Sequence, residues 1–181
     1  IHNTPSTLPT VTSWDAINLK EPLLRGIYAY GFEVPSDIQK QAIIPIIQGK
    51  DIIAQAQSGT GKTGSFSISI LERIDITQSC TQALILSPTH ELVKQTAGVI
   101  SDIGRNMDGL KVKTLVGGTP VREDVVALKY HTPHIVVGTV GRVLDMFQKR
   151  HLRGDALKML IMDEADEMLS QGFSEKIRWL F

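Results

Sequence analysis

Short apolar runs alternate along this chain with longer segments in which apolar residues recur at helical spacing. The apolar or strand-like runs are residues 51–56, 83–86, 112–116, 135–137 and 159–162. Two helical stretches precede the first run: residues 19–30, ended by Gly31, and a stretch through Ile38, Ala42 and Ile46 that follows Pro35 and Ser36. Strands that alternate with helices form parallel sheets covered on both faces. The pattern therefore predicts one doubly wound α/β domain over residues 13–181, after a flexible Thr-, Pro- and Ser-rich tail at residues 1–12.

Composition narrows the class of protein and its partners. The 19 basic and 19 acidic side chains give a formal net charge of zero, so any nucleic-acid binding must rely on a local surface. Cys80 is the only cysteine, which excludes an internal disulfide. No apolar run approaches the roughly 18 residues of a membrane helix, and the first residues lack the layout of a signal peptide. We expect an intracellular protein without a membrane partner, cytoplasmic or nuclear.

Polar residues follow each apolar run. In an open parallel sheet, ligands bind beyond the carboxyl ends of the strands. The segments at those positions are rich in Gly, Thr, Asp, Glu and Arg, and they are residues 57–63, 87–91, 117–119, 139–142 and 163–166. We expect these five segments to carry the chemistry.

The first of these segments has the features of a phosphate-binding loop. Its residues are Gln57, Ser58, Gly59, Thr60, Gly61, Lys62 and Thr63. Backbone N–H groups of such a loop surround phosphate oxygens, and the following helix N-terminus adds partial positive charge. Lys62 is expected to reach the β- and γ-phosphates, and Thr63 to offer its hydroxyl to Mg²⁺. The general pattern has Gly at the first position, where this chain has Ala56.

The last segment, Asp163-Glu164-Ala165-Asp166, directly follows an apolar run. A carboxylate at a strand end near a phosphate loop is suited to hold Mg²⁺, which assigns this role to Asp163. Glu164 is then placed to orient and deprotonate an attacking water. A solvated acidic turn is the alternative, and the two carboxylates would point to opposite faces if the strand continued.

Taken together, these motifs are similar to those of the DEAD-box RNA helicases. The tetrad at 163–166 is the signature of that family, and Ala56 is its own loop variant. Gly31-Phe32, Pro35-Ser36 and Ile38-Gln39 resemble the adenine-reading Q motif, with Trp14 in place of the family's upstream aromatic residue. Pro88-Thr89-His90-Glu91-Leu92, Gly117-Gly118 and Thr139-Val140-Gly141-Arg142 resemble motifs Ia, GG and Ib. The similarity runs from Trp14 to the end, and residues 23–32 most resemble the translation initiation factor 4A branch.

The resemblance implies a RecA-like domain of an RNA-dependent ATPase that unwinds or remodels RNA, with ATP and Mg²⁺ as cofactors. It assigns nucleotide binding to Trp14, Phe32, Gln39 and the phosphate loop, and an interdomain role to Asp166. It assigns backbone contacts with RNA to Pro88, Thr89, His90, Glu91, Gly117, Gly118, Thr139, Gly141 and Arg142. A second RecA-like domain and a helical-repeat scaffold are the implied protein partners. Motif III and that second domain do not occur in the sequence, so we expect this chain alone to hydrolyse ATP poorly.

Two residues depart from the family pattern. His90 stands where the family has Arg, which replaces a fixed, forked cation with a largely neutral imidazole. Val140 stands where the family has Pro, which removes a preset φ at the first helical position. These departures leave open an ATP-binding scaffold with impaired RNA-stimulated turnover. A relative acting in splicing-linked mRNA marking or in ribosome maturation is equally compatible with the motifs.

Other classes of protein fit the sequence less well. A small GTPase or kinase could use the same loop, but the chain has no Asn-Lys-x-Asp stretch for guanine. His90-Glu91 begins the H-E-x-x-H pattern of a zinc protease, and the fifth position is Lys94, so the second ligand is missing. His131 and His134 are interpreted as ordinary loop histidines.

Overall fold

The computed structural model describes residues 13–49, 60–172 and 174–179 of the chain. The expected strand at 51–56 and the loop residues 57–59 lie outside this part. The described strands are β1 (Ala83–Leu86), β2 (Val112–Leu115), β3 (Ile135–Gly138) and β4 (Met159–Met162). The helices are the 3₁₀ turn η1 (Asp15–Ile17), α1 (Glu21–Tyr30), α2 (Asp37–Ile47), α3 (Thr60–Arg73), α4 (His90–Ile103), α5 (Val121–Tyr130), α6 (Val140–Gln148), α7 (Ala165–Ser170) and α8 (Ser174–Trp179).

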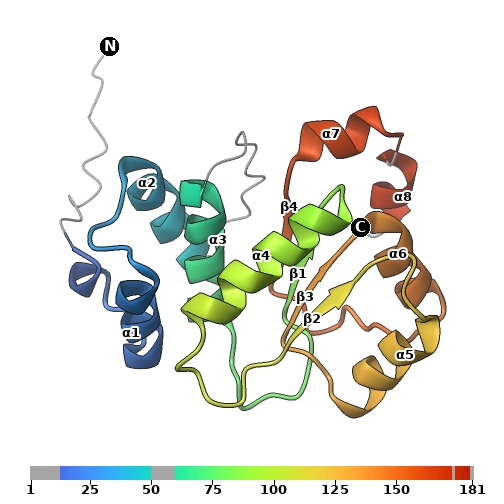
Figure 1. Cartoon of the computed structure of the whole chain (residues 1–181), viewed down its shortest axis with the longest axis horizontal. Helices are drawn as coiled ribbons and strands as arrows, with labels where there is room; N and C mark the ends of the chain where they lie inside the picture. Colours follow the sequence, from blue (N-terminus) through green and yellow to red (C-terminus); the bar gives the residue numbers. More distant parts are fainter. Residues whose placement is uncertain (1–12, 50–59, 173, 180–181) are drawn as a thin grey trace.

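The four strands form one parallel sheet in the order β2-β3-β1-β4. Because neighbouring strands run in the same direction, each connection between successive strands crosses a face of the sheet through helical structure, as Figure 1 shows. The paired residues Leu86↔Gly138 and Leu86↔Met162 place the carboxyl ends of β1, β3 and β4 level with one another. The polar segments that follow these strands therefore begin at one edge of the sheet.

Helices cover both faces of this sheet. Ala83 and Ile85 of β1 pack into one buried cluster together with α1 to α4, whereas Leu84 and Leu86 pack into a second cluster with α5, α6 and α7. Because both faces are buried, β1, β3 and β4 lack polar side chains, whereas β2 at the end of the strand order contains Lys113 and Thr114. The predicted doubly wound α/β fold is confirmed for the described residues. Among these residues, no helix is long and apolar enough to cross a membrane.

The N-terminal helices are fixed against α3 and α4. A Cβ on Gly26 of α1 would lie 1.8 Å from the carbonyl oxygen of Ile103, the last residue of α4, so only glycine permits this approach. The Nζ of Lys20 donates to the carbonyl oxygen of Ile74 (2.6 Å), just beyond the end of α3. Figure 1 shows α1 and α2 together on one side of the molecule, next to α3. This packing places the chain after α1 beside the first turns of α3.

Candidate functional site

Backbone hydrogen bonds hold the segments after the strands side by side. The Asp163 N–H donates to the Leu86 carbonyl (2.8 Å), and the Ser87 N–H donates to the Gly138 carbonyl (3.0 Å). The Thr139 N–H donates to the Leu115 carbonyl (3.0 Å). These bonds extend the sheet beyond its regular strands, so the four polar segments after β1 to β4 converge at its carboxyl edge. The convergence expected from the sequence is confirmed for these segments.

Lys62 and Asp163 form a buried ion pair at this edge. Lys62 lies in the first turn of α3, and its Nζ is 3.5 Å from Oδ1 of Asp163, with side chains 8% and 7% exposed. Burial strengthens the attraction between opposite charges, because little water screens it. The pair therefore fixes the relative position of the helix that follows the phosphate loop and the strand that carries the acidic tetrad.

Glu164 changes the direction of the chain after Asp163. Its φ of 51° and ψ of 50° lie in the left-handed region, which costs a non-glycine residue about 1 kcal/mol or more. The turn ends β4 and begins α7, whose residues Ala165 and Met168 are buried while Asp166 is exposed. Lys62, Thr63, Asp163 and Glu164 line one cavity of about 550 Å³. Both carboxylates therefore face the same cavity, and the simple alternation of a continued strand does not apply.

The donor set at this cavity fits Mg²⁺ in its usual mode in nucleotide enzymes. Thr63 and Asp163 supply oxygen atoms to the same space, and Mg²⁺ is generally bound by one or two protein groups together with water and substrate phosphates. Among the described residues, no group of three His, Cys, Asp or Glu side chains could hold a metal ion by itself. A protein-only metal cage is thus not found in this part of the chain.

The expected adenine-reading residues lie between α1 and α3. Phe32 packs beside Tyr30 with ring centroids 5.0 Å apart, and the ring centroids of Trp14 and Phe32 are 6.3 Å apart. The Trp14 indole N–H donates to the Phe32 carbonyl oxygen (3.0 Å), and Trp14 is fully buried. Trp14 therefore supports Phe32 from inside the core rather than contributing a surface for a ligand.

Gln39 is part of a capping box at the start of α2. Its Oε1 accepts from the Ser36 N–H (2.8 Å), and its own N–H donates to the Ser36 Oγ (3.2 Å). The side chain is therefore held in one orientation, with a second lone pair and the amide N–H₂ still able to bond. Gln39 is 2% exposed, so its side chain is not part of the outer surface.

Gly64 joins the adenine side to the phosphate side, and sequence reasoning missed it. A Cβ at this position would lie 2.9 Å from the Phe32 ring and 3.3 Å from the Gln39 Nε2. Gly64 directly follows Thr63 in α3, so only glycine lets the Phe32–Gln39 pair pack against this turn. A glycine inside a helical pattern, one residue after the Gly-Lys-Thr core, was the available signal.

The expected RNA-contact residues form two contact groups. Thr89 caps α4 by accepting from the Leu92 N–H (3.2 Å). His90, exposed in the first turn of α4, lies beside Gly117 and Gly118, with ring atoms 4.0 Å from where a Cβ would be on each glycine. Motifs Ia and GG are thus brought together. Pro88 is half-buried and Glu91 is exposed at the same helix start.

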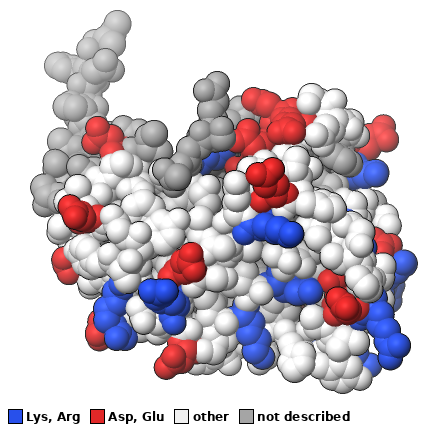
Figure 2. Space-filling model, in the orientation of Figure 1, with Lys and Arg blue, Asp and Glu red and all other residues white. Residues whose placement is uncertain are grey.

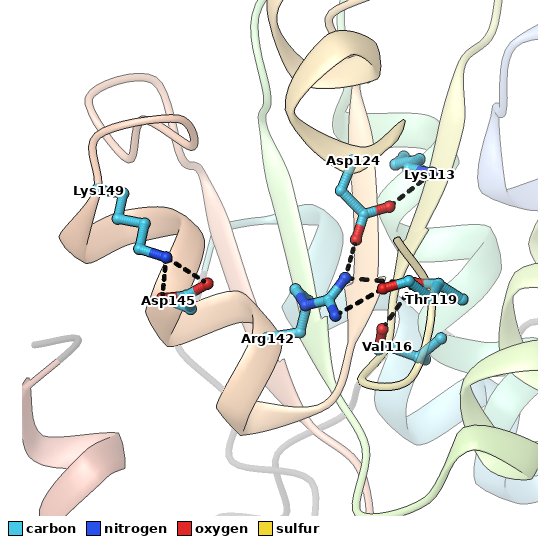
Figure 3. Close-up of polar contacts among 7 residues, drawn as sticks. All are labelled: Lys113, Val116, Thr119, Asp124, Arg142, Asp145 and Lys149. Carbon is cyan, nitrogen blue, oxygen red and sulfur yellow. Dashed lines mark hydrogen bonds and ion pairs between the residues drawn. The ribbon is translucent and has the colours of Figure 1, made fainter. Parts of the chain in front are cut away.

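Arg142 makes internal contacts at the second group, as Figure 3 shows. Its guanidinium donates to Asp124 Oδ2 (2.6 Å) and to both the carbonyl oxygen (2.9 Å) and the Oγ1 (3.2 Å) of Thr119. Lys113 Nζ lies 3.0 Å from the other oxygen of Asp124, which is 2% exposed. Arg142 was expected to contact RNA, and here its side chain, 9% exposed, ties the loop after Gly118 to α6.

Asp124 is the second residue that the sequence analysis missed. It lies one helical turn before Leu128 on the buried face of α5, where an acidic side chain is unusual unless it is paired. A carboxylate on the apolar face of a predicted helix was therefore a signal for a buried cation. Periodicity alone does not identify that cation, because Arg142 belongs to a different helix.

The remaining motif Ib residues lie around the start of α6. Thr139 occupies the N-cap position, but its side chain makes no capping hydrogen bond. Val140 is 1% exposed and belongs to the buried cluster under α6, so its side chain packs in the core and is not part of the outer surface. Gly141 is exposed, with open space around it.

His134 lies in a loop, as interpreted from the sequence, and it is also buried there. His134 is 4% exposed, its Nδ1 accepts from the Lys111 N–H (3.1 Å), and its Nε2 lies 3.0 Å from the Ile76 carbonyl oxygen. Burial lowers the pKa of this imidazole below its ordinary value, although the contact with Ile76 opposes the shift. The neutral ring thus joins the starts of β2 and β3 to the loop after α3. His131, by contrast, is exposed at the end of α5.

Comparisons with known proteins agree with this arrangement. The family model for the DEAD/DEAH box helicases matches residues 36–181. The chain is 56% identical over 172 residues to the "ATP-dependent RNA helicase eIF4A" of Neurospora crassa, covering 95% of this chain and 43% of that protein. It is 58% identical over 169 residues to the protein of the same name from Aspergillus fumigatus, covering 93% and 41%. The chain thus spans less than half the length of these curated relatives.

Solved structures show the same fold. A DEAD box protein from the hyperthermophile Methanococcus jannaschii has a TM-score of 0.86 and 37% identity, covering 92% of this chain and 45% of its own. Dbp5 of S. cerevisiae, bound to RNA and ADP BeF3, has a TM-score of 0.78 and 33% identity, covering 92% and 42%. The expected RecA-like architecture is confirmed by these neighbours. With its paired Lys62 and Asp163, its acidic tetrad at a strand end and a family match over most of its length, this chain belongs to the DEAD/DEAH box helicase family.

Proposed function

We propose that this chain is the ATP-binding domain of an RNA-dependent ATPase that unwinds or remodels RNA during translation initiation. The observation that carries the proposal is the convergence of Lys62, Asp163 and Glu164 on one cavity at the carboxyl edge of the sheet. The relatives named eIF4A support the pathway. A role in translation initiation corresponds to action in the cytoplasm.

The roles of the cavity residues follow from their positions. Lys62 binds the β- and γ-phosphates of ATP, which requires it to exchange its contact with Asp163 for phosphate oxygens. Asp163 and Thr63 would hold Mg²⁺, which would neutralise charge at the phosphates when bound. Glu164 faces the same cavity from the strand-to-helix turn and orients the attacking water and accepts its proton.

Recognition of the base is assigned to the residues between α1 and α3. Phe32 lies against the adenine, and the Gln39 amide pairs with the donor and acceptor of the adenine edge. Support for Phe32 comes from the Trp14 hydrogen bond beneath it, and for Gln39 from the capping box that fixes its orientation. The loop residues 57–61 complete the nucleotide site in this proposal.

RNA is assigned to the surface formed by motifs Ia, GG and Ib. His90 lies beside Gly117 and Gly118, and Arg142 fixes the following Thr119. Such helix starts and glycine-rich turns offer N–H groups and hydroxyls to a sugar–phosphate backbone and do not read sequence. This local surface explains how a chain of zero net charge can bind RNA.

A second RecA-like domain is the proposed partner for turnover, with Asp166 on the exposed side of α7 facing it. Cationic side chains supplied by another domain typically accelerate phosphoryl transfer by about 10³–10⁵. We therefore expect the chain by itself to bind ATP weakly and to hydrolyse it slowly. A helical-repeat scaffold that holds the two domains together is the further partner.

The test measures ATP hydrolysis with and without RNA, for this chain alone and joined to the second domain of an eIF4A relative. The joined protein should show RNA-stimulated turnover that Glu164→Gln removes while ATP binding persists. Strong RNA-stimulated hydrolysis by the chain alone would contradict the division of labour between domains. Turnover that survives Glu164→Gln would remove the assigned role of that carboxylate.

An ATP-binding scaffold with little RNA-stimulated turnover is the second candidate, and His90 favours it. The imidazole lies next to the glycine pair, where the family has a forked, permanently charged side chain. If the joined protein binds ATP but responds to RNA only after His90→Arg, the scaffold function is correct. If wild type already responds, any gain in RNA affinity from His90→Arg measures the effect of this departure.

A further inference from the structure

The strand β2 has an open edge at the surface of the molecule. It lies at the end of the strand order in the described sheet, and it pairs only with β3 there. Residues Val112, Lys113 and Thr114 are all partly exposed, whereas every residue of β1 and β3 is buried. Figure 1 shows β2 between α4 and α5, with no further strand drawn beyond it.

Val112 and Thr114 direct their backbone groups away from β3. The Lys111 carbonyl accepts from the N–H groups of His134 and Ile135, and the Leu115 carbonyl accepts from the Thr139 N–H. Successive residues of a strand point their N–H and C=O groups to opposite edges. Lys111 and Leu115 face β3, so Val112 and Thr114 face outward. Among the described residues, no hydrogen bond to the backbone of Val112 or Thr114 comes from that side.

A basic groove runs along this edge. Its volume is about 540 Å³, and β2 with its preceding residues forms the floor between the end of α4 and the end of α5. The charged or titratable side chains among its described lining residues are Arg105, Lys111, Lys113 and His131, and none of the described lining residues is acidic. Figure 2 shows basic side chains on the surface between α4 and α5, whereas the acidic groups gather most densely over α7.

The geometry points to this edge as a docking site for an extended acidic peptide segment of a partner protein, which would add a strand next to β2. An added strand bonds to outward N–H and C=O groups of the edge it joins. Val112 and Thr114 offer both kinds of group, and acidic side chains of the peptide would meet Lys111 and Arg105. RNA fits less well, because phosphate oxygens only accept hydrogen bonds and would leave the outward carbonyl oxygens unbonded.

A protective role for the lysines must be separated from docking. Proteins commonly place lysine on edge strands to prevent pairing with other chains. Lysines in this role repel basic strands and lose hydration when a neutral strand pairs beside them, but they do not oppose an acidic strand. The discriminating observation is therefore whether a strand of the right charge forms backbone hydrogen bonds here.

The experiment measures binding of a fluorescein-labelled peptide of alternating glutamate and valine, about eight residues long, which exceeds the length of the edge strand. We expect saturable binding by anisotropy and slower hydrogen exchange of the Val112 and Thr114 amides in the complex. Lys111→Glu should weaken binding about tenfold, as expected when the attraction by an exposed lysine becomes a repulsion. Arg153→Glu is the matched control, because this exposed arginine does not line the groove, and it should bind as wild type does.

Backbone pairing is tested on the protein and on the peptide. Thr114→Pro removes an outward N–H that β3 does not use, and Thr114→Val is its control. A peptide N-methylated at alternate residues gives the same test with the protein unchanged. Of the two peptides that carry the methyl groups at odd or at even positions, one should not bind. The proposal is overturned if no peptide binds, if N-methylation has no effect in either register, if oligouridylate binds the same residues in place of the peptide, or if the edge pairs with a second copy of the chain.

Discussion

Replacement of Asp124 by alanine tests whether the buried charge cluster around Arg142 holds together the loops that are proposed to bind RNA. Asp124 is 2% exposed and bonds to two cations, one of them Arg142 at 2.6 Å. Breaking a buried ion pair by removing one partner typically costs about 3–5 kcal/mol, because the other charge stays buried. The variant is therefore expected to lose a large share of the stability of a domain of this size.

Two features of the cluster reduce that loss. Lys113 is 27% exposed on its side chain, so it can turn toward water when Asp124 is removed. Arg142 keeps the carbonyl oxygen of Thr119 as an acceptor, so its guanidinium is not left without a partner. We expect Asp124→Ala to lower the free energy of unfolding by about 2–4 kcal/mol.

Asp145→Ala is the matched control for this experiment. Asp145 pairs with Lys149 at i,i+4 on the outer face of α6, where the lysine is 57% exposed (Figure 3). Such a pair contributes about 0.3–0.5 kcal/mol. Urea unfolding should therefore separate the two variants clearly, at an unchanged dependence of the unfolding free energy on denaturant.

A double-mutant cycle completes the test. If Asp124 and Arg142 act as one unit, the effects of Asp124→Ala and Arg142→Ala will be non-additive by about 1 kcal/mol or more. RNA affinity should fall in both variants, since the loop that carries Gly118 is held through Thr119. A loss of stability no greater than that of Asp145→Ala, or additive effects in the cycle, would refute the reasoning.

Three further predictions concern other buried groups. Burial lowers the pKa of His134 in the folded state, so the unfolded chain binds more protons just below pH 6.5. The stability that this histidine contributes should therefore be full above that pH and fall on acidification below it. The unfolding midpoints at pH 7.5 and 5.5 should differ less in His134→Asn than in wild type. Gly64→Ala should push the Phe32 ring aside and weaken binding of a fluorescent ATP analogue about fivefold, equivalent to about 1 kcal/mol of ring displacement, and unchanged affinity would contradict this. Ser87 has a fully buried hydroxyl without a hydrogen-bond partner among the described residues, so Ser87→Ala should raise the free energy of unfolding by about 1 kcal/mol, and a loss of stability in thermal melts would show an undetected partner.

The strand bounds that the sequence predicted best belong to two continuous apolar runs. Residues 83–86 and 159–162 are strands with the expected bounds, because a continuous apolar run can pack against helices on both faces of the sheet. The strand predicted at 112–116 ends one residue earlier in the structure, at Leu115. The next residue, Val116, is buried beside the turn that begins the GG motif. Its apolar side chain therefore indicates burial in the core and not a position in the strand.

Contacts between segments far apart in the chain could not be predicted in the same way. Local periodicity identifies the buried face of α5, but it does not say that Asp124 on that face meets Arg142 of α6. Likewise, His134 is buried because three separate segments meet around its ring. The motifs predicted the residues that are proposed for the site, whereas the groups that hold those residues in place depend on the tertiary packing.

Trp14 has a consequence for measurement. Its indole is buried and hydrogen-bonded to the backbone of Phe32, the residue assigned to the adenine. Indole emission responds to changes in its hydrogen bond and surroundings, so this side chain is a built-in optical reporter placed behind the ligand and not in contact with it. With Trp179 replaced by phenylalanine, the fluorescence of a single tryptophan would follow the occupancy of the adenine pocket in an unlabelled protein.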